Sequence, residues 1–154
     1  MIFAARTSDI PVVQRLFRAY AESLPFSLDF QGFAVELAGL PGAYGPPAGC
    51  LLIARQGSEA SGIVGLKPLE PGIAEIKRLY VVPEARGSGL GRALAEQALA
   101  EARAKGYERV RLDTHRPSMA GAIALYRRLG FVEIAPYGPD LDGQIAFFEK
   151  RLSE

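Results

Sequence analysis

One stretch near the middle of the chain limits what the rest can fold into. It runs from Ala74 to Arg92, AEIKRLYVVPEARGSGLGR, and reads as a strand that stops at Pro83, a glycine-rich turn, and a helix from about Leu90. Three glycines in five residues let backbone N–H groups converge without interference from a Cβ. The start of a helix adds unpaired N–H donors and a partial positive charge. The stretch therefore predicts an anion site, most naturally for phosphate, with Arg86 and Arg92 beside it.

Two common phosphate motifs do not fit these residues. A P-loop needs Lys and then Ser or Thr after its last glycine, and here Arg and Ala follow Gly91. A dinucleotide fingerprint that starts at Gly87 or Gly89 needs a small residue where Arg92 or Leu94 stands. Both motifs are excluded.

The stretch resembles instead the cofactor-binding motif of the GNAT superfamily, the GCN5-related N-acetyltransferases. The signature Arg/Gln-x-x-Gly-x-Gly/Ala is met by Arg86 to Gly91, after a strand ending Leu-Tyr-Val-Val-Pro. A second signature, Ala-x-x-Leu-Tyr-x-x-x-Gly-Phe, is met by Ala122 to Phe131. The order and spacing of the two signatures match the family. The resemblance is weak before Gly62 and strong from Glu75 to Phe131.

Periodicity predicts eleven elements in the order β-α-α-β-β-β-α-β-α-β-β, without an internal domain boundary. The expected strands are 2–6, 49–54, 63–69, 73–82, 109–114, 131–134 and 145–150, and the expected helices are 10–21, 33–40, 90–105 and 117–129. This order predicts an α/β fold with a mixed central sheet and helices on both faces. The resemblance implies a single N-acetyltransferase domain over residues 1–154, with the GNAT fold.

The strand over residues 73–82 changes phase. Ala74 and Ile76 share one face, whereas Leu79 and Val81 fall in the opposite phase, and the change lies at Lys77-Arg78. Such a slip indicates a β-bulge, although a plain strand with its tyrosine on the core face is the alternative. In the GNAT family a bulge here splays two central strands and opens a slot for coenzyme A.

The resemblance implies acetyl-CoA as co-substrate and no metal. The glycine loop would hold the pyrophosphate, and the strand before it would bind the pantetheine arm through its backbone. The residues expected at the cofactor are Leu79, Tyr80, Val81, Arg86, Gly87, Ser88, Gly89, Leu90, Gly91 and Arg92. Many relatives have Asn where Met119 stands, so an amide contact is missing here or comes from Ser118.

Acyl transfer to an amine needs a base for the nitrogen and benefits from an acid for the departing sulfur. Tyr126 matches the family tyrosine that serves as the acid, and a core aromatic is its alternative role. Glu75 is the expected base, unless it is a structural carboxylate paired with Lys77 or Arg111. His115, the only histidine, is the other candidate base and is more simply a substrate contact.

The acceptor is expected between two loops, 24–40 and 137–143, which mix aromatic and acidic residues. Phe26, Phe30, His115 and Tyr137 are the candidate acceptor contacts. Such a composition suits a cationic or amphipathic amine.

Composition narrows the class of protein further. The net charge is +1 with Lys and Arg spread along the chain, so neither nucleic acid nor a membrane surface is an expected partner. No signal peptide or membrane span is apparent, and one cysteine, Cys50, fits a buried strand position in a reducing cytoplasm. Because many relatives pair, a homodimer is one expected state.

The sequence thus predicts an acetyl-CoA-dependent N-acetyltransferase that modifies a primary amine of a small molecule by direct attack in a ternary complex. A protein or peptide N-acetyltransferase is the alternative within enzymes, although no acidic run is present to attract lysine-rich tails. A non-catalytic acyl-CoA sensor is the alternative from another class.

Overall fold

A seven-stranded mixed sheet runs through the molecule in the order β1-β2-β3-β4-β5-β7-β6. The structure is a computed structural model that describes residues 1–152. The strands are β1 (Ile2–Ala4), β2 (Cys50–Gln56), β3 (Glu59–Glu70), β4 (Ile73–Val81), β5 (Arg109–His115), β6 (Val132–Ile134) and β7 (Ile145–Arg151). The helices are α1 (Ile10–Glu22), α2 (Phe33–Ala38), α3 (Leu90–Ala104) and α4 (Ala120–Arg128). β4 and β5 pair in parallel, and their neighbours pair antiparallel.

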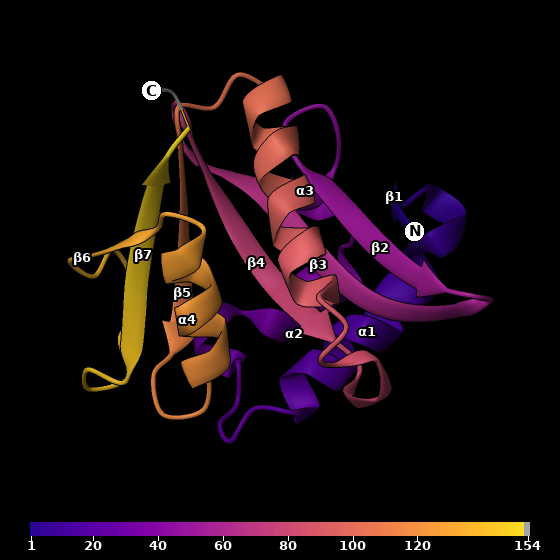
Figure 1. The fold of residues 1–154 in the computed structure, drawn as a ribbon, viewed down its shortest axis with the longest axis horizontal. Coiled ribbons are helices and arrows are strands. Elements are labelled where there is room, and N and C mark those ends of the chain that lie inside the picture. The colour runs from indigo at the N-terminus through magenta and orange to yellow at the C-terminus, as the bar shows by residue number, and fades with distance from the viewer. Residues whose placement is uncertain (153–154) are drawn as a thin grey trace.

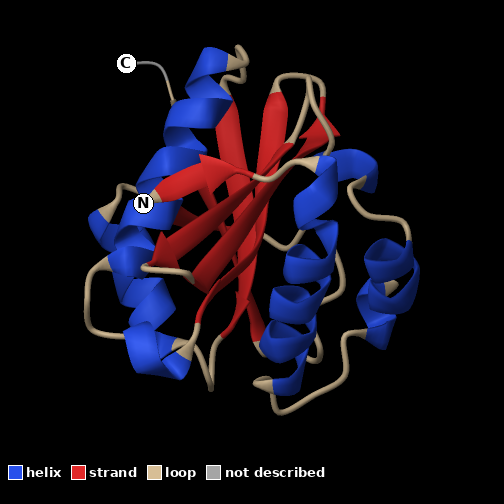
Figure 2. Cartoon of the chain, turned by 90° about the vertical axis from the view of Figure 1, so that its right-hand side faces the viewer, coloured by secondary structure: helices blue, strands red, loops and turns tan. Residues whose placement is uncertain are grey.

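Helices cover both faces of this sheet, as Figure 2 shows. α3 and α4 lie on one face, over a core that includes Ile76, Leu112 and Phe148. α1 lies on the other face, where Leu16 and Phe17 pack against residues of β2 and β3. β2 and β3 alternate between the two cores, with Leu52 and Val64 under α3 and Leu51 and Ile63 under α1. The predicted α/β fold with a mixed central sheet is confirmed.

All eleven predicted elements are present, with ends that move by a few residues. The largest change is at β3, which was predicted from residue 63 and begins at Glu59, and α4 was predicted from residue 117 and begins at Ala120. Ser118 does not cap the helix, because its hydroxyl lies 2.7 Å from Nδ1 of His115. Cys50 opens β2 and is buried, as predicted, and burial raises the pKa of its thiol to about 11. Within residues 1–152, no helix has the length and apolar character needed to cross a membrane.

The predicted bulge is present in β4. On β3, Ile63 pairs with Tyr80 and Gly65 pairs with Lys77, so two residues of β4 stand opposite one of β3. Arg78 absorbs the extra residue with a φ of +62°, a backbone conformation that side chains other than glycine seldom adopt. The bulge returns Leu79 to the core under α3, while the preceding two side chains both lie on the face of α1 and α2. The plain-strand alternative is excluded.

β4 and β5 pair with each other over only part of their length. They pair over Ile73–Glu75 and Arg109–Arg111, although β4 continues to Val81 and β5 to His115. Beyond the paired residues the two strands diverge, with α3 over β4 and α4 over β5 (Figure 1). The edge of β4 that faces this gap is therefore free of strand partners over residues 76–81.

Candidate active site

The glycine loop leaves a row of backbone donors without partners. Gly87 and Gly89 both adopt φ +82°, a conformation open to glycine, and α3 starts directly after them. Among the described residues, no acceptor is present for the six consecutive N–H groups from Gly87 to Arg92. A Cβ built on either positive-φ glycine would meet no atom within 4 Å, so the space above the loop is open. Six unpaired amides at the start of a 15-residue helix fit a pyrophosphate well.

The two arginines beside the loop differ in what they contact. Arg86 donates from Nε to the Val81 carbonyl at 3.0 Å, and its guanidinium lies 5.7 Å from the Tyr80 ring centre. Arg92 instead bonds Glu96 one turn along α3, at 3.1 Å, and both side chains are half exposed. Arg86 is therefore fixed at the end of β4, whereas Arg92 lies on the outside of the helix.

Two adjoining cavities follow the gap between β4 and β5. The outer one, about 380 Å³, is lined at its mouth by Leu79, Tyr80, Val81 and Arg86. The inner one, about 50 Å³, reaches Lys77, Arg78, Asp113 and Tyr126. Both are bounded by Tyr20, Leu79, Met119 and Ala122, so they form one slot, and this name is used for the pair. The predicted pantetheine-binding residues lie at its mouth.

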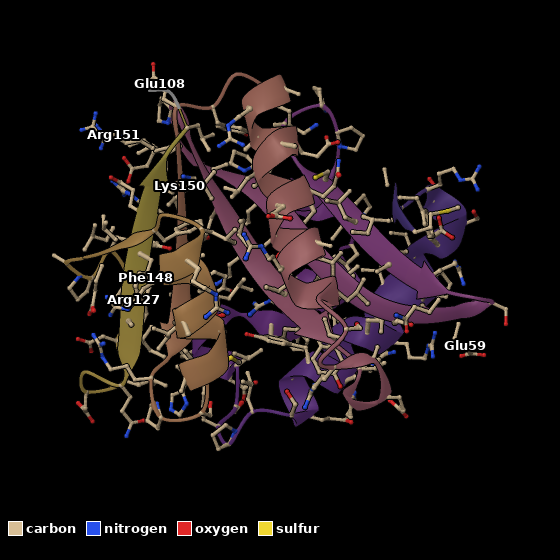
Figure 3. All side chains as sticks on the ribbon, in the orientation of Figure 1. Glu59, Glu108, Arg127, Phe148, Lys150 and Arg151 are labelled. Atoms are coloured by element: carbon tan, nitrogen blue, oxygen red, sulfur yellow. The ribbon has the colours of Figure 1, made fainter. Side chains whose placement is uncertain are left out.

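Tyr126 lies on the wall of the slot formed by α4. Its side chain is 6% exposed and its ring packs edge to face on Phe131, 5.7 Å between centres. The Arg127 guanidinium lies 5.4 Å from the centre of the Phe148 ring, which ties α4 to β7; both residues are labelled in Figure 3. No described residue hydrogen-bonds the Tyr126 hydroxyl, which is left free towards the slot. Burial raises the pKa of this hydroxyl well above its usual range, so it stays protonated and can donate.

Glu75 is placed with Tyr137 rather than in the slot. It is 4% exposed, and its Oε2 accepts a hydrogen bond from the Tyr137 hydroxyl at 2.6 Å. Lys67 Nζ lies 3.9 Å from Oε1, so the carboxylate pairs with neither Lys77 nor Arg111. Burial and then the charge of Glu75 raise the pKa of Tyr137. The structure thus brings together a predicted base and a predicted acceptor contact.

The other three predicted acceptor contacts form one group. The Phe26 ring lies 6.0 Å from that of Phe30 and 4.6 Å from the imidazole of His115. Both nitrogens of His115 are engaged, Nδ1 with Ser118 and Nε2 with Gln144 at 3.3 Å. His115 therefore links β5, the turn before α4 and the loop before β7, and it is buried. In residues 1–152, no three His, Cys, Asp or Glu side chains gather as a metal site would require.

Sequence reasoning missed a polar network on the face of α1 and α2. Arg78 bonds both carboxylate oxygens of Glu36 and, through Nη1, Oε1 of Gln31 at 2.8 Å. Lys77 also reaches Gln31, at 3.3 Å, and lies 3.5 Å from Asp113. Alternation along β5 places Asp113 on the face opposite to the apolar residues of that strand. This alternation was the signal in the sequence from which Asp113 could have been found.

Comparison with known proteins agrees with this geometry. The model of the GNAT acetyltransferase family matches residues 13–131. An uncharacterized N-acetyltransferase of Schizosaccharomyces pombe is 37% identical over 131 residues, which is 84% of this chain and 80% of that protein.

Solved structures show the same fold. A GNAT-family acetyltransferase of Staphylococcus aureus has a TM-score of 0.82 at 19% identity, over 99% of both chains. The PaiA N-acetyltransferase of Thermoplasma acidophilum, in complex with coenzyme A, has a TM-score of 0.74 at 22% identity, over 98% of both chains. From the family match over most of its length, its relatives and its fold, this chain belongs to the GNAT family and is an N-acetyltransferase.

Proposed function

We propose that this protein transfers the acetyl group of acetyl-CoA to a primary amine of a small molecule, by direct attack while both substrates are bound. The observation that carries the proposal is the row of six unpaired N–H groups directly after Arg86, which lines the slot, together with a free tyrosine hydroxyl on the slot's wall. A diphosphate held at the loop would direct the rest of a long cofactor along the slot. The slot and loop thus suit one extended ligand.

The chain's own residues divide the work of holding this ligand. The amides from Gly87 to Arg92 would bind the pyrophosphate, with Arg86 adding a positive charge. The free edge of β4 would bind pantetheine amides at Leu79 and Val81. When bound, the thioester supplies an activated carbonyl carbon. The residues of the slot would exclude water from it and set the direction of attack.

Tyr126 is proposed as the acid that protonates the departing sulfur. Its hydroxyl makes no hydrogen bond to a described residue, and its raised pKa keeps it protonated at neutral pH. Glu75, the base predicted from the sequence, does not line the slot. Its bond to Tyr137 and its place outside the slot would require a water between it and the amine.

The size of the inner slot supports a small acceptor. It holds about 50 Å³, and its lining includes Tyr20 of α1, Asp113 of β5 and Tyr126 of α4. A narrow cavity between these elements favours a small amine over a lysine on a folded protein surface.

The test is a thermal shift measurement followed by an acetyl transfer assay. Acetyl-CoA and CoA are expected to raise the Tm, whereas NAD and ATP at equal concentration should do so much less. Release of free thiol is then measured with a panel of small primary amines and with lysine-containing and N-terminal peptides. Turnover confined to peptides would support the protein-acetyltransferase alternative, and stabilisation without turnover on any amine would support a sensor.

A further inference from the structure

An ion pair crosses the gap between the two diverging strands. Glu75 and Arg111 are the last paired residues of β4 and β5, and Lys77 and Asp113 lie two positions further along each strand. Because side chains alternate along a strand, both lie on the face of α1 and α2. Lys77 Nζ is 3.5 Å from Asp113 Oδ2. The pair therefore lies at the inner end of the slot, on the face opposite to Tyr126.

Asp113, which is half-buried, differs from Glu75 and Glu36 in having no hydrogen-bond donor within residues 1–152. Among the described residues that line the slot, it is the one carboxylate. Its side chain is 20% exposed, against 6% for Glu75. No described residue donates a hydrogen bond to it, whereas Glu75 is bonded by Tyr137 and Glu36 by Arg78 and Tyr44. A carboxylate without hydrogen bonds that faces a cavity has room to accept them from a ligand.

Asp113 can still bind a cation, although Lys77 and Arg78 line the same cavity. Arg78 is compensated by Glu36, and Lys77 makes its shortest contact with Gln31 rather than with Asp113. Lys77 Nζ lies 3.5 Å from Oδ2 of Asp113, and Oδ1 is free of partners among the described residues. An ammonium entering the slot could therefore bind Oδ1. Such a charge-assisted bond would hold the nitrogen between Asp113 and the wall that carries Tyr126.

We propose that Asp113 is a catalytic residue that binds the acceptor as an ammonium ion and takes the proton that makes its nitrogen a nucleophile. This rests on the proposed function. The nitrogen–carbon bond then forms as the carbon–sulfur bond breaks, and the nitrogen loses a second proton to solvent. The sulfur receives a proton from Tyr126, which regains one from solvent, and Asp113 releases its proton to solvent. The sum is ammonium plus thioester giving amide, thiol and one proton.

This assignment sets the substrate class as an aliphatic amine that is charged at neutral pH. It also predicts an effect on the acetylation rate that a purely structural role for Asp113 would not produce. A weakly basic amine such as O-methylhydroxylamine is already neutral at pH 7, so it does not need Asp113 to remove its first proton. The loss caused by a variant of Asp113 should therefore depend on the basicity of the amine.

The experiment compares Asp113→Asn, Asp113→Glu, Glu75→Gln and the control Glu59→Gln, at an exposed position outside both acceptor loops. Thiol release is measured with an aliphatic amine that the wild type acetylates and with O-methylhydroxylamine, and binding of acetyl-CoA is followed by thermal shift. For Asp113→Asn we expect kcat/KM to fall by about 100-fold or more with the aliphatic amine. With the weakly basic amine it should fall by less than about tenfold, because the general-base contribution is the part removed. The acetyl-CoA shift should be unchanged, Asp113→Glu should recover part of the rate, and the two other variants should show no dependence on basicity.

Two results would overturn the assignment. An equal loss with both amines in a folded Asp113→Asn, without recovery in Asp113→Glu, would make Asp113 structural. A loss that depends on basicity in Glu75→Gln instead would give the role to Glu75. If Asp113→Asn does not fold, Asp113→Glu decides by the same comparison of amines. Failure of the proposed function is distinct, because the wild type itself would then bind acetyl-CoA and acetylate no amine, and the assignment would fall with it.

Discussion

Arg78 and Glu36 form a two-pronged ion pair between the bulge of β4 and helix α2. Nε lies 2.9 Å from Oε2 and Nη2 lies 2.7 Å from Oε1, and the arginine side chain is 2% exposed. Arg78 is also the residue with the positive φ at the bulge. The backbone conformation that opens the slot is therefore fixed by a residue 42 positions earlier in the chain.

Glu36→Gln should destabilise the protein strongly. The change leaves a buried guanidinium without its counter-charge, and breaking such a pair costs about 3 kcal/mol or more. Urea unfolding followed by circular dichroism measures the loss. Glu22→Gln, at an exposed position of α1, is the control and should stay within about 0.5 kcal/mol of wild type. Equal stability of the two variants would contradict this role for the pair.

The same pair makes stability depend on pH. Burial alone would raise the pKa of Glu36, but the hydrogen bonds and charge of Arg78 outweigh it and lower that pKa below 4.5. A lowered folded-state pKa gives stability that is present above the unfolded value and is lost as pH falls through the folded value. The difference in unfolding free energy between wild type and Glu36→Gln should therefore shrink as pH is lowered below 4.5. A difference that grows towards acid would reverse the sign and refute the argument.

Gly89→Val should weaken the binding of acetyl-CoA. Gly89 has φ +82° with open space beside it, so a side chain would strain the backbone and fill the approach to the loop amides. We expect acetyl-CoA affinity, measured by calorimetry, to fall more than tenfold, which is about 1.4 kcal/mol.

Gly57→Val is the matched control for that strain. Gly57 has φ +67° in the β2–β3 turn, with nothing within 4 Å of a built Cβ. Both variants should lose about 1 to 2 kcal/mol of stability from the left-handed backbone, and only Gly89→Val should lose affinity. Unchanged binding in a folded Gly89→Val would remove the loop from the site.

Tyr126→Phe should slow turnover while leaving the protein folded. The hydroxyl makes no bond to a described residue, so its removal should change stability by no more than about 1 kcal/mol. We expect kcat to fall about 10- to 1,000-fold, with a smaller effect on the KM of acetyl-CoA, because the bond strengthens as sulfur gains charge. Tyr107→Phe loses a 2.8 Å bond to the Ala48 carbonyl, outside the slot, and should keep full activity. Full activity in a folded Tyr126→Phe would leave the departing sulfur to water.

Local patterns in the sequence were enough to predict most of the fold. The phase slip at Lys77 and Arg78 is visible in the sequence of this strand alone. The bulge and its position could therefore be predicted without knowledge of any other strand. The ends of helices were predicted less accurately where a side chain bonds a residue outside the helix. The last helix was predicted from residue 117, but the Ser118 hydroxyl engages His115, and α4 begins at Ala120.

The site was harder to predict because its polar contacts join residues far apart in sequence. Glu75 bonds Tyr137, 62 positions away, and no local pattern announces that bond. Asp113 gains its importance only because β4 and β5 stop pairing just before it. The glycine loop could be predicted as an anion site because its donors are consecutive in the chain.

The divergence of β4 and β5 leaves a sheet edge inside the molecule. An outer edge strand can pair with any passing chain, and proteins usually protect such edges. Here α3 lies over β4 and α4 over β5 on either side of the gap (Figure 1), and the free edge borders the slot. The pantetheine arm of coenzyme A is a single extended chain with amides spaced along it. On the proposed function, the fold would therefore select its cofactor partly as a sheet selects a missing strand, by length, thinness and the placement of amide groups.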